Sequence, residues 1–113
     1  MRLFKSFQYA WNGILYCFKT QANFRIHILG FIFMLASAYY FRFEKIEWIA
    51  CLMLSALVFF AELINTAIES VVDLTTQEIS ELAKVAKDCA AGAVLVLAIF
   101  SVVVWGIIVF GKF

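Results

Sequence analysis

The chain has 113 residues, of which 65% are hydrophobic and 18% aromatic, and its mean hydropathy is +0.97. A soluble domain of this size cannot bury so much apolar surface, so the composition excludes an ordinary globular fold and indicates a membrane protein. Nine basic residues, scattered along the chain, face eight acidic ones and leave a formal net charge of +1. Because phosphate backbones require a basic face, a nucleic-acid partner is not expected.

Residues 1–20 predict an amphipathic helix. Apolar side chains recur at helical spacing on one side of it, at Phe4, Phe7, Trp11, Ile14, Leu15 and Phe18. The other side carries Arg2, Lys5, Tyr9, Asn12, Gly13 and Tyr16. A helix with aromatic apolar side chains opposite a basic and phenolic face is typical of the membrane interface, so we expect this helix to lie at the bilayer surface.

Three membrane spans are expected after this helix, at residues 24–43, 46–73 and 86–111. The third is uncharged from Cys89 to Gly111, which satisfies the length of about 20 apolar residues that a span needs. The first is flanked by Arg25 and Arg42, whose long side chains can extend to the bilayer surface. These segments predict an all-α integral membrane protein.

The second span differs from the others because it carries charge. It is uncharged from Trp48 to Ala61 and then continues with helical periodicity through Glu62 and Glu69 to Asp73. The polar segment between Leu74 and Ala83 is expected to form a connection outside the membrane. Residues 1–113 therefore form a single domain in this interpretation.

The basic residues predict the orientation of the spans. One side of the membrane receives Arg2, Lys5, Lys19, Arg25, Lys84 and Lys87, and the other receives Arg42, Lys45 and Lys112. By the positive-inside rule, the N-terminus and the connection between the second and third spans are cytoplasmic. We expect a multi-pass protein of the cell inner (cytoplasmic) membrane with this cytoplasmic side exposed to ATP.

The second span carries a stripe of polar side chains. Glu62, Asn65, Glu69 and Asp73 are spaced i, i+3, i+7 and i+11, which places them on one face of a helix. A charge near the bilayer centre costs about 2.5–3.5 kcal/mol on insertion scales, so the stripe requires a divalent cation, a cationic partner or a water-filled cavity. A cation suits hard oxygen ligands around nucleotide phosphates. The alternative is structural, with side chains that join helices by hydrogen bonds and an Asp73 that is simply cytoplasmic.

The third span opens with charged residues followed by small ones. Lys84, Lys87 and Asp88 precede the small residues 90–93. Small side chains allow a second helix to approach closely, so Lys87 can meet the carboxylates of the second span or a phosphate oxygen beside them. The alternative is that Lys87 only anchors the helix at the cytoplasmic surface.

These motifs resemble the prokaryotic diacylglycerol kinase and undecaprenol kinase family. The resemblance rests on AELINTAIESVVDL at 61–74, KDCAAGAV at 87–94 and NFRIH at 23–27, and it covers essentially the whole chain. It implies a homotrimer in which each protomer contributes a surface helix and three spans, with active sites between protomers at the cytoplasmic interface. It also implies transfer of the γ-phosphate of ATP, with Mg²⁺, to the hydroxyl of a membrane lipid alcohol, which would feed phospholipid or cell-wall lipid-carrier recycling.

The resemblance assigns roles to individual residues. Glu62 corresponds to the general base, Glu69 to a ligand of the ATP-bound magnesium, and Asn65 to a group that holds the γ-phosphate or orients Glu62. The positions that contact ATP are matched by Arg2, Tyr9, Glu69, Glu78, Lys87 and Asp88. Asp73 supports this set at the end of the stripe.

Two positions bear on metal and substrate. Gln21 stands where well-studied members of the family carry a metal-binding glutamate, and an amide is a weaker magnesium ligand. Either Glu69 and the phosphates suffice, or Gln21 binds through a water. His27 resembles the undecaprenol kinase branch, which favours undecaprenol slightly over diacylglycerol, unless His27 is only a polar residue at headgroup level.

Two other function classes remain open at this point. A small proton-coupled exporter also places a glutamate within a short multispan oligomer, but it needs only one essential carboxylate. A structural subunit of a larger assembly would tolerate the change Glu62→Gln.

Overall fold

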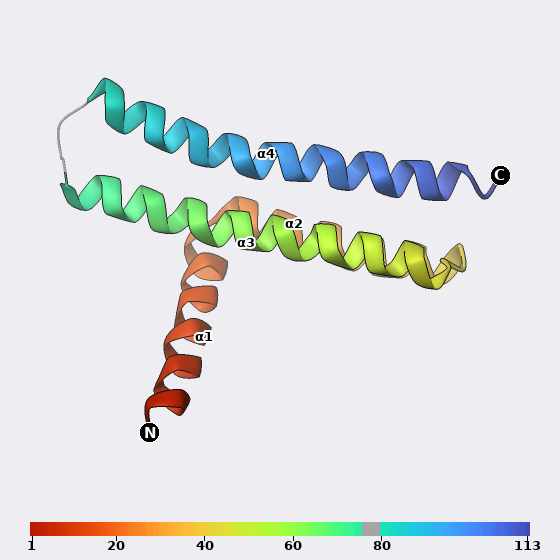
Figure 1. The fold of residues 1–113 in the computed structure, drawn as a ribbon, viewed down its shortest axis with the longest axis horizontal. Helices are drawn as coiled ribbons and strands as arrows, with labels where there is room; N and C mark the ends of the chain where they lie inside the picture. The colour runs from red at the N-terminus through yellow and green to blue at the C-terminus, as the bar shows by residue number, and fades with distance from the viewer. Residues whose placement is uncertain (76–79) are drawn as a thin grey trace.

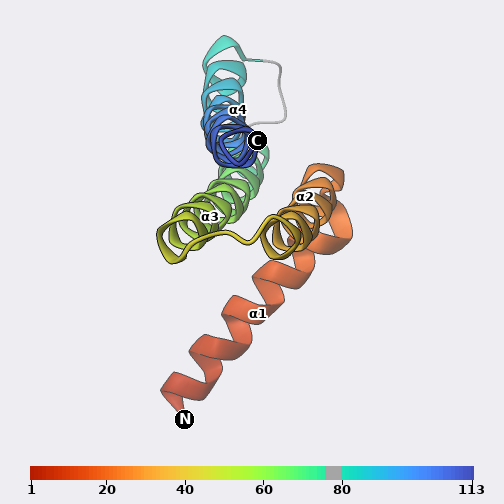
Figure 2. The same cartoon turned by 90° about the vertical axis from the view of Figure 1, so that its right-hand side faces the viewer.

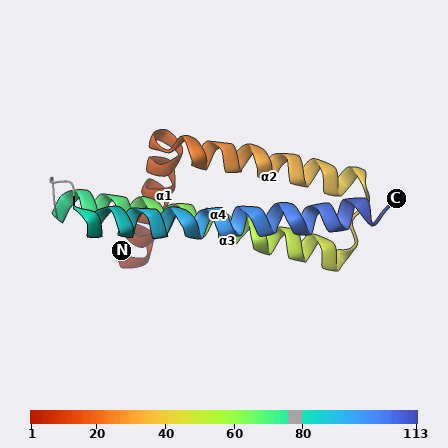
Figure 3. The same ribbon diagram turned by 90° about the horizontal axis from the view of Figure 1, so that it is seen from above.

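The computed structural model describes residues 1–75 and 80–113, and the regular structure in these residues is helical. The helices are α1 (Arg2–Thr20), α2 (Ala22–Tyr40), α3 (Lys45–Thr75) and α4 (Glu81–Phe110). Figure 1 shows α4 alongside α3, with α2 behind α3, as a bundle of long helices, while α1 runs across their direction. Figure 3 shows α2 beside the overlapping α3 and α4. Figure 2 shows the N-terminal half of α1 projecting away from this bundle.

The two ends of the bundle are formed by different helix termini. At the end that we call the distal end, α2 ends, α3 begins and α4 ends. At the opposite end, which we call the site end, α3 ends and α4 begins. On that side α2 begins next to α1, part of the way along α3. The polar stripe of α3 lies toward the site end.

Three of the helices are long and apolar enough to cross a membrane, as predicted. Helices α2, α3 and α4 have 19, 31 and 30 residues, with mean hydropathies of 1.3, 2.0 and 3.0 over their most apolar windows. At a rise of 1.5 Å per residue, α3 is about 46 Å long, well beyond the hydrocarbon thickness of about 30 Å. Part of α3 therefore extends beyond the hydrocarbon region.

Helix α2 ends earlier than residue 43, where the first span was expected to end. The backbone N–H of Phe43 donates to the carbonyl of Ala38 at 2.9 Å, and that of Arg42 donates to Tyr39 at 3.4 Å. Arg42 has a positive φ of 54°. This is the Schellman arrangement that closes helices, usually with glycine in the left-handed position. An arginine there gives no sequence signal, and the apolar Phe41 and Phe43 on either side extend the hydropathy past the true end.

Helix α4 begins at Glu81, five residues before the start of the expected third span at 86. Ser80 caps it, with its side chain accepting from the backbone N–H of Ala83 at 3.5 Å. Helix α3 continues to Thr75. Both helices therefore extend into the polar segment between Leu74 and Ala83 that is expected to lie outside the membrane.

The junction of α1 and α2 is fixed by Arg25. Its Nη1 atom donates to the backbone carbonyls of Phe18 at 2.7 Å and Lys19 at 3.2 Å. These carbonyls belong to the last turn of α1, where unpaired acceptors favour a cationic donor. Arg25 therefore links the direction of α1 to that of α2, a role that the sequence did not predict.

A contiguous apolar core lies at the distal end of the bundle. The buried core there consists of Met34, Ala38, Phe43, Cys51 and Val109. Trp105 Nε1 donates to Ser37 Oγ at 2.7 Å and joins α4 to α2. Nearer the site end, Phe24 and Phe31 of α2 both pack against the ring of Phe59, with centroid distances of 5.6 and 5.7 Å.

Candidate functional site

The centre of the candidate site is a buried carboxylate. Glu62 is only 2% exposed, and its Oε1 lies 3.3 Å from Nε2 of His27 on α2. A buried carboxylate is costly without a hydrogen-bonding partner. The imidazole supplies that partner, as a donor when neutral at Nε2 and as a cation when protonated.

The contact between His27 and Glu62 is the feature of the site that sequence reasoning missed. From the sequence, His27 is expected to discriminate substrates or to lie at headgroup level. The structure places it one helix away from the predicted general base and within contact distance of it. Helical periodicity assigns each residue to a face of its own helix but not to a partner on another helix. One feature of the sequence could have indicated this contact. Glu62 and His27 are an acid and a base at similar depth in two antiparallel spans, and neither has an evident partner on its own helix.

Asn65 occupies the next turn of the stripe. Its Nδ2 donates to Glu69 Oε1 at 3.2 Å, so the structure brings these two predicted site residues together. Asn65 is buried, and among the described residues its Oδ1 has no hydrogen-bond partner. A buried acceptor of this kind is rare in native proteins and suits an additional donor or a cation. Glu69 is half-buried, which leaves one side of its carboxylate accessible.

Helices α3 and α4 are joined at the site end by an ion pair. Lys87 Nζ lies 2.6 Å from Asp73 Oδ1, and the small side chains of Ala86, Ala90 and Ala93 line the space between the two helices. Lys87 is half-buried whereas Asp73 is exposed. The structure therefore places the lysine against the last carboxylate of the stripe, where Asp73 holds its ammonium group beside the polar face.

The remaining predicted residues lie apart from this cluster within one chain. Asp88 is exposed and pairs with Lys84 of its own helix at 2.5 Å. Arg2 and Tyr9 lie on the exposed N-terminal half of α1, which projects away from the bundle (Figure 2). Gln21 lies between α1 and α2, where its amide donates to Thr20 Oγ1 at 3.4 Å. Glu78 lies outside the described residues.

The oxygen donors of the site match part of what a magnesium ion requires. Across residues 1–75 and 80–113, no group of three or more His, Cys, Asp or Glu side chains is arranged to hold a metal. Mg²⁺ bound with nucleotides usually keeps its waters and takes one or two carboxylates plus phosphate oxygens, rather than an all-protein cage. Glu69, with the unpaired Oδ1 of Asn65 nearby, fits that partial donor set.

The site end combines the buried carboxylate of Glu62, which could act as a base, with the half-buried carboxylate of Glu69 and the ammonium group of Lys87. Glu62 lies on the apolar side of the stripe, and Glu69 and Lys87 lie closer to the end of α3. This order suits a reaction between a membrane-embedded group and a charged, water-soluble one.

Comparison with known proteins identifies relatives of this chain. The family model described as prokaryotic diacylglycerol kinase matches residues 8–109. A diacylglycerol kinase of Synechocystis sp. is 51% identical over 105 residues, which cover 92% of this chain and 60% of that protein. An undecaprenol kinase of Bacillus subtilis is 41% identical over 109 residues, covering 96% of this chain and 88% of the relative. A diacylglycerol kinase of Escherichia coli is 30% identical over 112 residues, or 99% and 92% of the two chains.

These findings confirm the family predicted from the sequence, and the relatives are kinases by name, in agreement with the predicted phosphotransferase class. Together with the three apolar helices, they identify a multi-pass membrane protein. The chain belongs to the prokaryotic diacylglycerol kinase family.

Proposed function

We propose that this protein is a lipid kinase that transfers the γ-phosphate of ATP to the hydroxyl group of a membrane lipid alcohol. The observation that carries the proposal is the buried Glu62 carboxylate held by His27, one helical turn from the Asn65–Glu69 pair. Family membership supports it. Undecaprenol and diacylglycerol are the candidate substrates, since relatives of both names match this chain. Undecaprenol is placed first because His27 resembles the undecaprenol kinase branch.

In the proposed reaction, the alcohol oxygen attacks the γ-phosphorus as the bond to the β-phosphate oxygen breaks, and ADP leaves. Glu62 accepts the proton of the alcohol, and His27 keeps its carboxylate in place. Asn65 contacts the phosphate or orients Glu62. Lys87 lies against the developing phosphate charge, with Asp73 holding it in position. No covalent enzyme intermediate is needed.

Magnesium is the proposed metal. Glu69 would hold it, together with phosphate oxygens of ATP, and it would neutralise phosphate charge during transfer. Gln21 stays outside the proposed ligand set, because the neutral oxygen of an amide is a weaker magnesium ligand than a carboxylate.

The proposal includes an assembly and an orientation. Because one chain leaves Arg2 and Tyr9 far from the stripe, we propose that ATP contacts from α1 and Asp88 reach the site of a neighbouring protomer in a homotrimer. Glu78 is proposed as a further ATP contact. The direction of α1 across the bundle supports its assignment to the membrane interface, on the cytoplasmic side of the inner membrane.

The test uses purified protein in lipid vesicles with γ-labelled ATP, magnesium and either undecaprenol or diacylglycerol. We expect label to enter the organic phase with at least one alcohol, and not with Glu62→Gln. Label that stays in the aqueous phase with both alcohols would contradict the kinase assignment. Comparing the two alcohols at equal mole fraction assigns the substrate.

A further inference from the structure

Helix α1 packs against the rest of the described chain only near its C-terminal end. Cys17 is its one buried residue and Leu15 is half-buried, whereas the other residues of α1 are exposed. Figure 2 shows the N-terminal half of the helix projecting away from the bundle. Arg2 and Tyr9, the proposed ATP contacts of α1, lie on this projecting half. Their positions therefore depend on the direction that α1 takes from its C-terminal end.

The membrane surface does not set this direction completely. An interfacial helix lies flat with its apolar face in the headgroup boundary, but the surface is the same in every direction within its plane. The backbone adds little, because a single residue, Gln21, separates α1 from α2. Its φ of −110° and ψ of 109° lie in the broad β region, where neighbouring values are also allowed. The in-plane direction of α1 must therefore come from a contact between α1 and the bundle.

Two hydrogen bonds at the end of α1 are local and carry no information about direction. The hydroxyl of Thr20 donates to the carbonyl of Tyr16 at 2.7 Å. The backbone N–H of Gln21 donates to the carbonyl of Cys17 at 2.9 Å. Both bonds form within α1 and its cap, so they persist whichever way α2 leaves the junction.

Arg25, in the first turn of α2, makes the contact that depends on direction. Its Nη1 atom donates to the next two carbonyls of α1, those of Phe18 at 2.7 Å and Lys19 at 3.2 Å. The negative end of the helix dipole adds attraction for the guanidinium group. Hydrogen bonds weaken steeply as their angles degrade, so one group bonded to two carbonyls defines an orientation. Because Arg25 is exposed, the contact buries little surface, and its main consequence is geometric.

We propose that Arg25 is a positioning residue for the nucleotide, because it fixes the in-plane direction of α1 and so brings Arg2 and Tyr9 to ATP. This inference rests on the proposed kinase function and its ATP contacts. At 1.5 Å per residue, Arg2 lies about 24 Å from Phe18, so a change of about 10° in direction moves Arg2 by about 4 Å. A displacement of that size breaks any hydrogen bond to a phosphate oxygen.

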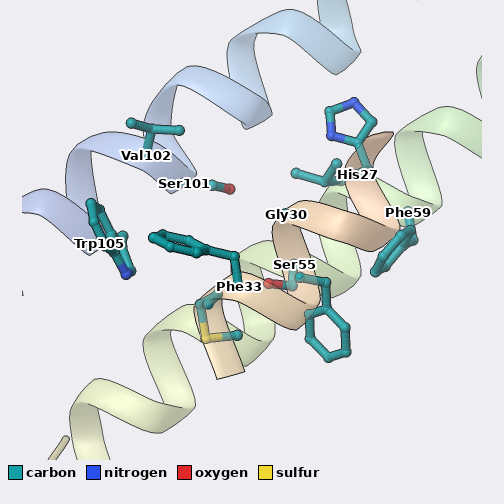
Figure 4. A pocket seen from close by; sticks show the side chains of 11 residues that line it. His27, Gly30, Phe33, Ser55, Phe59, Ser101, Val102 and Trp105 are labelled. Atoms are coloured by element: carbon teal, nitrogen blue, oxygen red, sulfur yellow. The ribbon is translucent and has the colours of Figure 1, made fainter. Parts of the chain in front are cut away.

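The effect of Arg25 can be separated from the lipid side of the reaction. The pocket between α2, α3 and α4 is lined on α2 by described residues that begin at His27 (Figure 4). His27 also makes the contact with Glu62. Neither feature includes Arg25, which bonds to α1. A change at Arg25 should therefore alter the use of ATP and leave the general base and the lipid alcohol unaffected.

The first test is kinetic and uses Arg25→Met, which keeps an unbranched side chain but has no donor. KM for ATP should rise at least about tenfold, the effect of losing a hydrogen bond to a charged group. KM for the lipid alcohol, and kcat at saturating ATP, should stay within about twofold of wild type. The carbonyls of Phe18 and Lys19 then face water, so the chain should still fold, and the thermal midpoint in detergent checks this.

Two further variants control the kinetic test. Lys19→Met removes a cation from the same junction, and the side chain of Lys19 is exposed without a hydrogen bond or ion pair in residues 1–75 and 80–113. It should resemble wild type. Arg25→Lys supplies an ammonium group that can reach one carbonyl but lacks the planar fork of arginine. Its KM for ATP should fall between those of wild type and Arg25→Met.

The second test measures the direction of α1 without catalysis. Spin labels at the exposed positions of Gln8 and Leu74 report the distance between α1 and the end of α3, in a chain whose three cysteines are replaced by alanine. An excess of unlabelled chains restricts the signal to distances within one chain. Wild type and Lys19→Met should give one narrow distance distribution. Arg25→Met should broaden it, and Arg25→Lys should give an intermediate width.

The two tests together separate the possible roles of Arg25. A higher KM for ATP with an unchanged distance distribution would mean that Arg25 contacts the nucleotide itself, and a higher KM for the lipid alcohol would assign it to that substrate. A broader distribution with an unchanged KM for ATP would mean that the direction of α1 does not govern ATP binding. Each of these results, or no change in either test, overturns the proposal. Wild-type protein that transfers no label from ATP would contradict the kinase function alone, since the distance measurement still tests the hold of Arg25 on α1.

Discussion

The two ends of the bundle are built on different principles. At the distal end, a buried core, a tryptophan hydrogen bond and the ion pair of Lys112 with Glu47, at 2.6 Å, join all three long helices. At the site end, α3 meets α2 through the buried pair of His27 and Glu62, and it meets α4 through a partly exposed ion pair. The acceptor of Asn65 stays unpaired there within the described residues. The distal end is built for stability, whereas the site end keeps groups available for ligands.

The comparison predicts that changes at the site end abolish chemistry and spare stability. Glu62→Gln should slow phosphate transfer by about 10²–10⁴-fold, the range associated with a general base, while ATP still binds. Removing an embedded charge should leave the thermal midpoint in detergent unchanged or raised. Single-turnover rates and nucleotide titrations measure the two quantities. A variant that loses ATP binding instead would assign Glu62 to the nucleotide.

Glu69→Gln should fail in a different way. Because Glu69 is the proposed magnesium ligand, its amide should weaken ATP binding at fixed magnesium by at least about tenfold and raise the magnesium concentration needed for half-maximal activity. Turnover should recover in part at high magnesium. The measurement is a magnesium titration of activity and of ATP affinity. An unchanged magnesium requirement would remove Glu69 from the metal site.

Variants of His27 test whether this residue positions Glu62 for catalysis or has only a structural role. His27→Phe removes the hydrogen bond to Glu62 and should lower kcat about tenfold to a hundredfold, the effect of losing a bond to a charged group. His27→Gln keeps a donor and should recover part of that loss. ATP affinity should change in neither variant, since it depends on other groups. Equal kcat values in both variants would show that the imidazole has no donor role.

At the distal end the pattern should reverse. Ser37→Ala leaves the Trp105 N–H without its partner and should lower the free energy of unfolding by about 1–3 kcal/mol. Unfolding by a denaturing detergent measures this loss. Turnover at a temperature where the variant stays folded should remain close to wild type. A large drop in kcat without a drop in stability would contradict the division of roles between the two ends.

The smallest effect is expected for the distal ion pair. Lys112→Met removes the contact with Glu47, whose side chain, like that of Lys112, is 22% exposed. Partly exposed pairs contribute at most about 1 kcal/mol. The same unfolding assay should therefore show a smaller change than for Ser37→Ala, with no change in kinase activity. A larger loss than for Ser37→Ala would mean that the pair, rather than the tryptophan hydrogen bond, joins this end.

Some features could be predicted from the sequence because they depend on local chemistry. Hydropathy predicts three membrane-long helices, since burial in lipid requires about 20 apolar residues whatever the neighbours are. The spacing of Asn65 and Glu69 predicts their proximity, because residues four apart share a helix face. The resemblance to the family also rests in part on residues 61–74 of α3, and the family model matches residues 8–109.

Other features could not be predicted because they depend on tertiary placement or on backbone geometry. The contact between His27 and Glu62 joins two helices whose rotation the sequence does not fix. The left-handed Arg42 ends α2 at a position where glycine would have been expected. Arg25 caps the end of α1, a contact that depends on how α1 and α2 are placed relative to each other. The separation of Arg2 and Tyr9 from the stripe follows from the direction of α1, which periodicity does not give.

The length of α3 gives the proposed reaction a fixed depth. Counting from Lys45 at 1.5 Å per residue, Glu62 lies about 26 Å along the helix and Glu69 about 36 Å. The edge of a hydrocarbon layer about 30 Å thick falls between these two carboxylates when Lys45 marks the opposite edge. The helix therefore sets the depths of the two carboxylates relative to the edge of the hydrocarbon layer. In the proposed reaction the alcohol stays within the hydrocarbon layer, the nucleotide stays outside it, and only the phosphoryl group passes from one to the other.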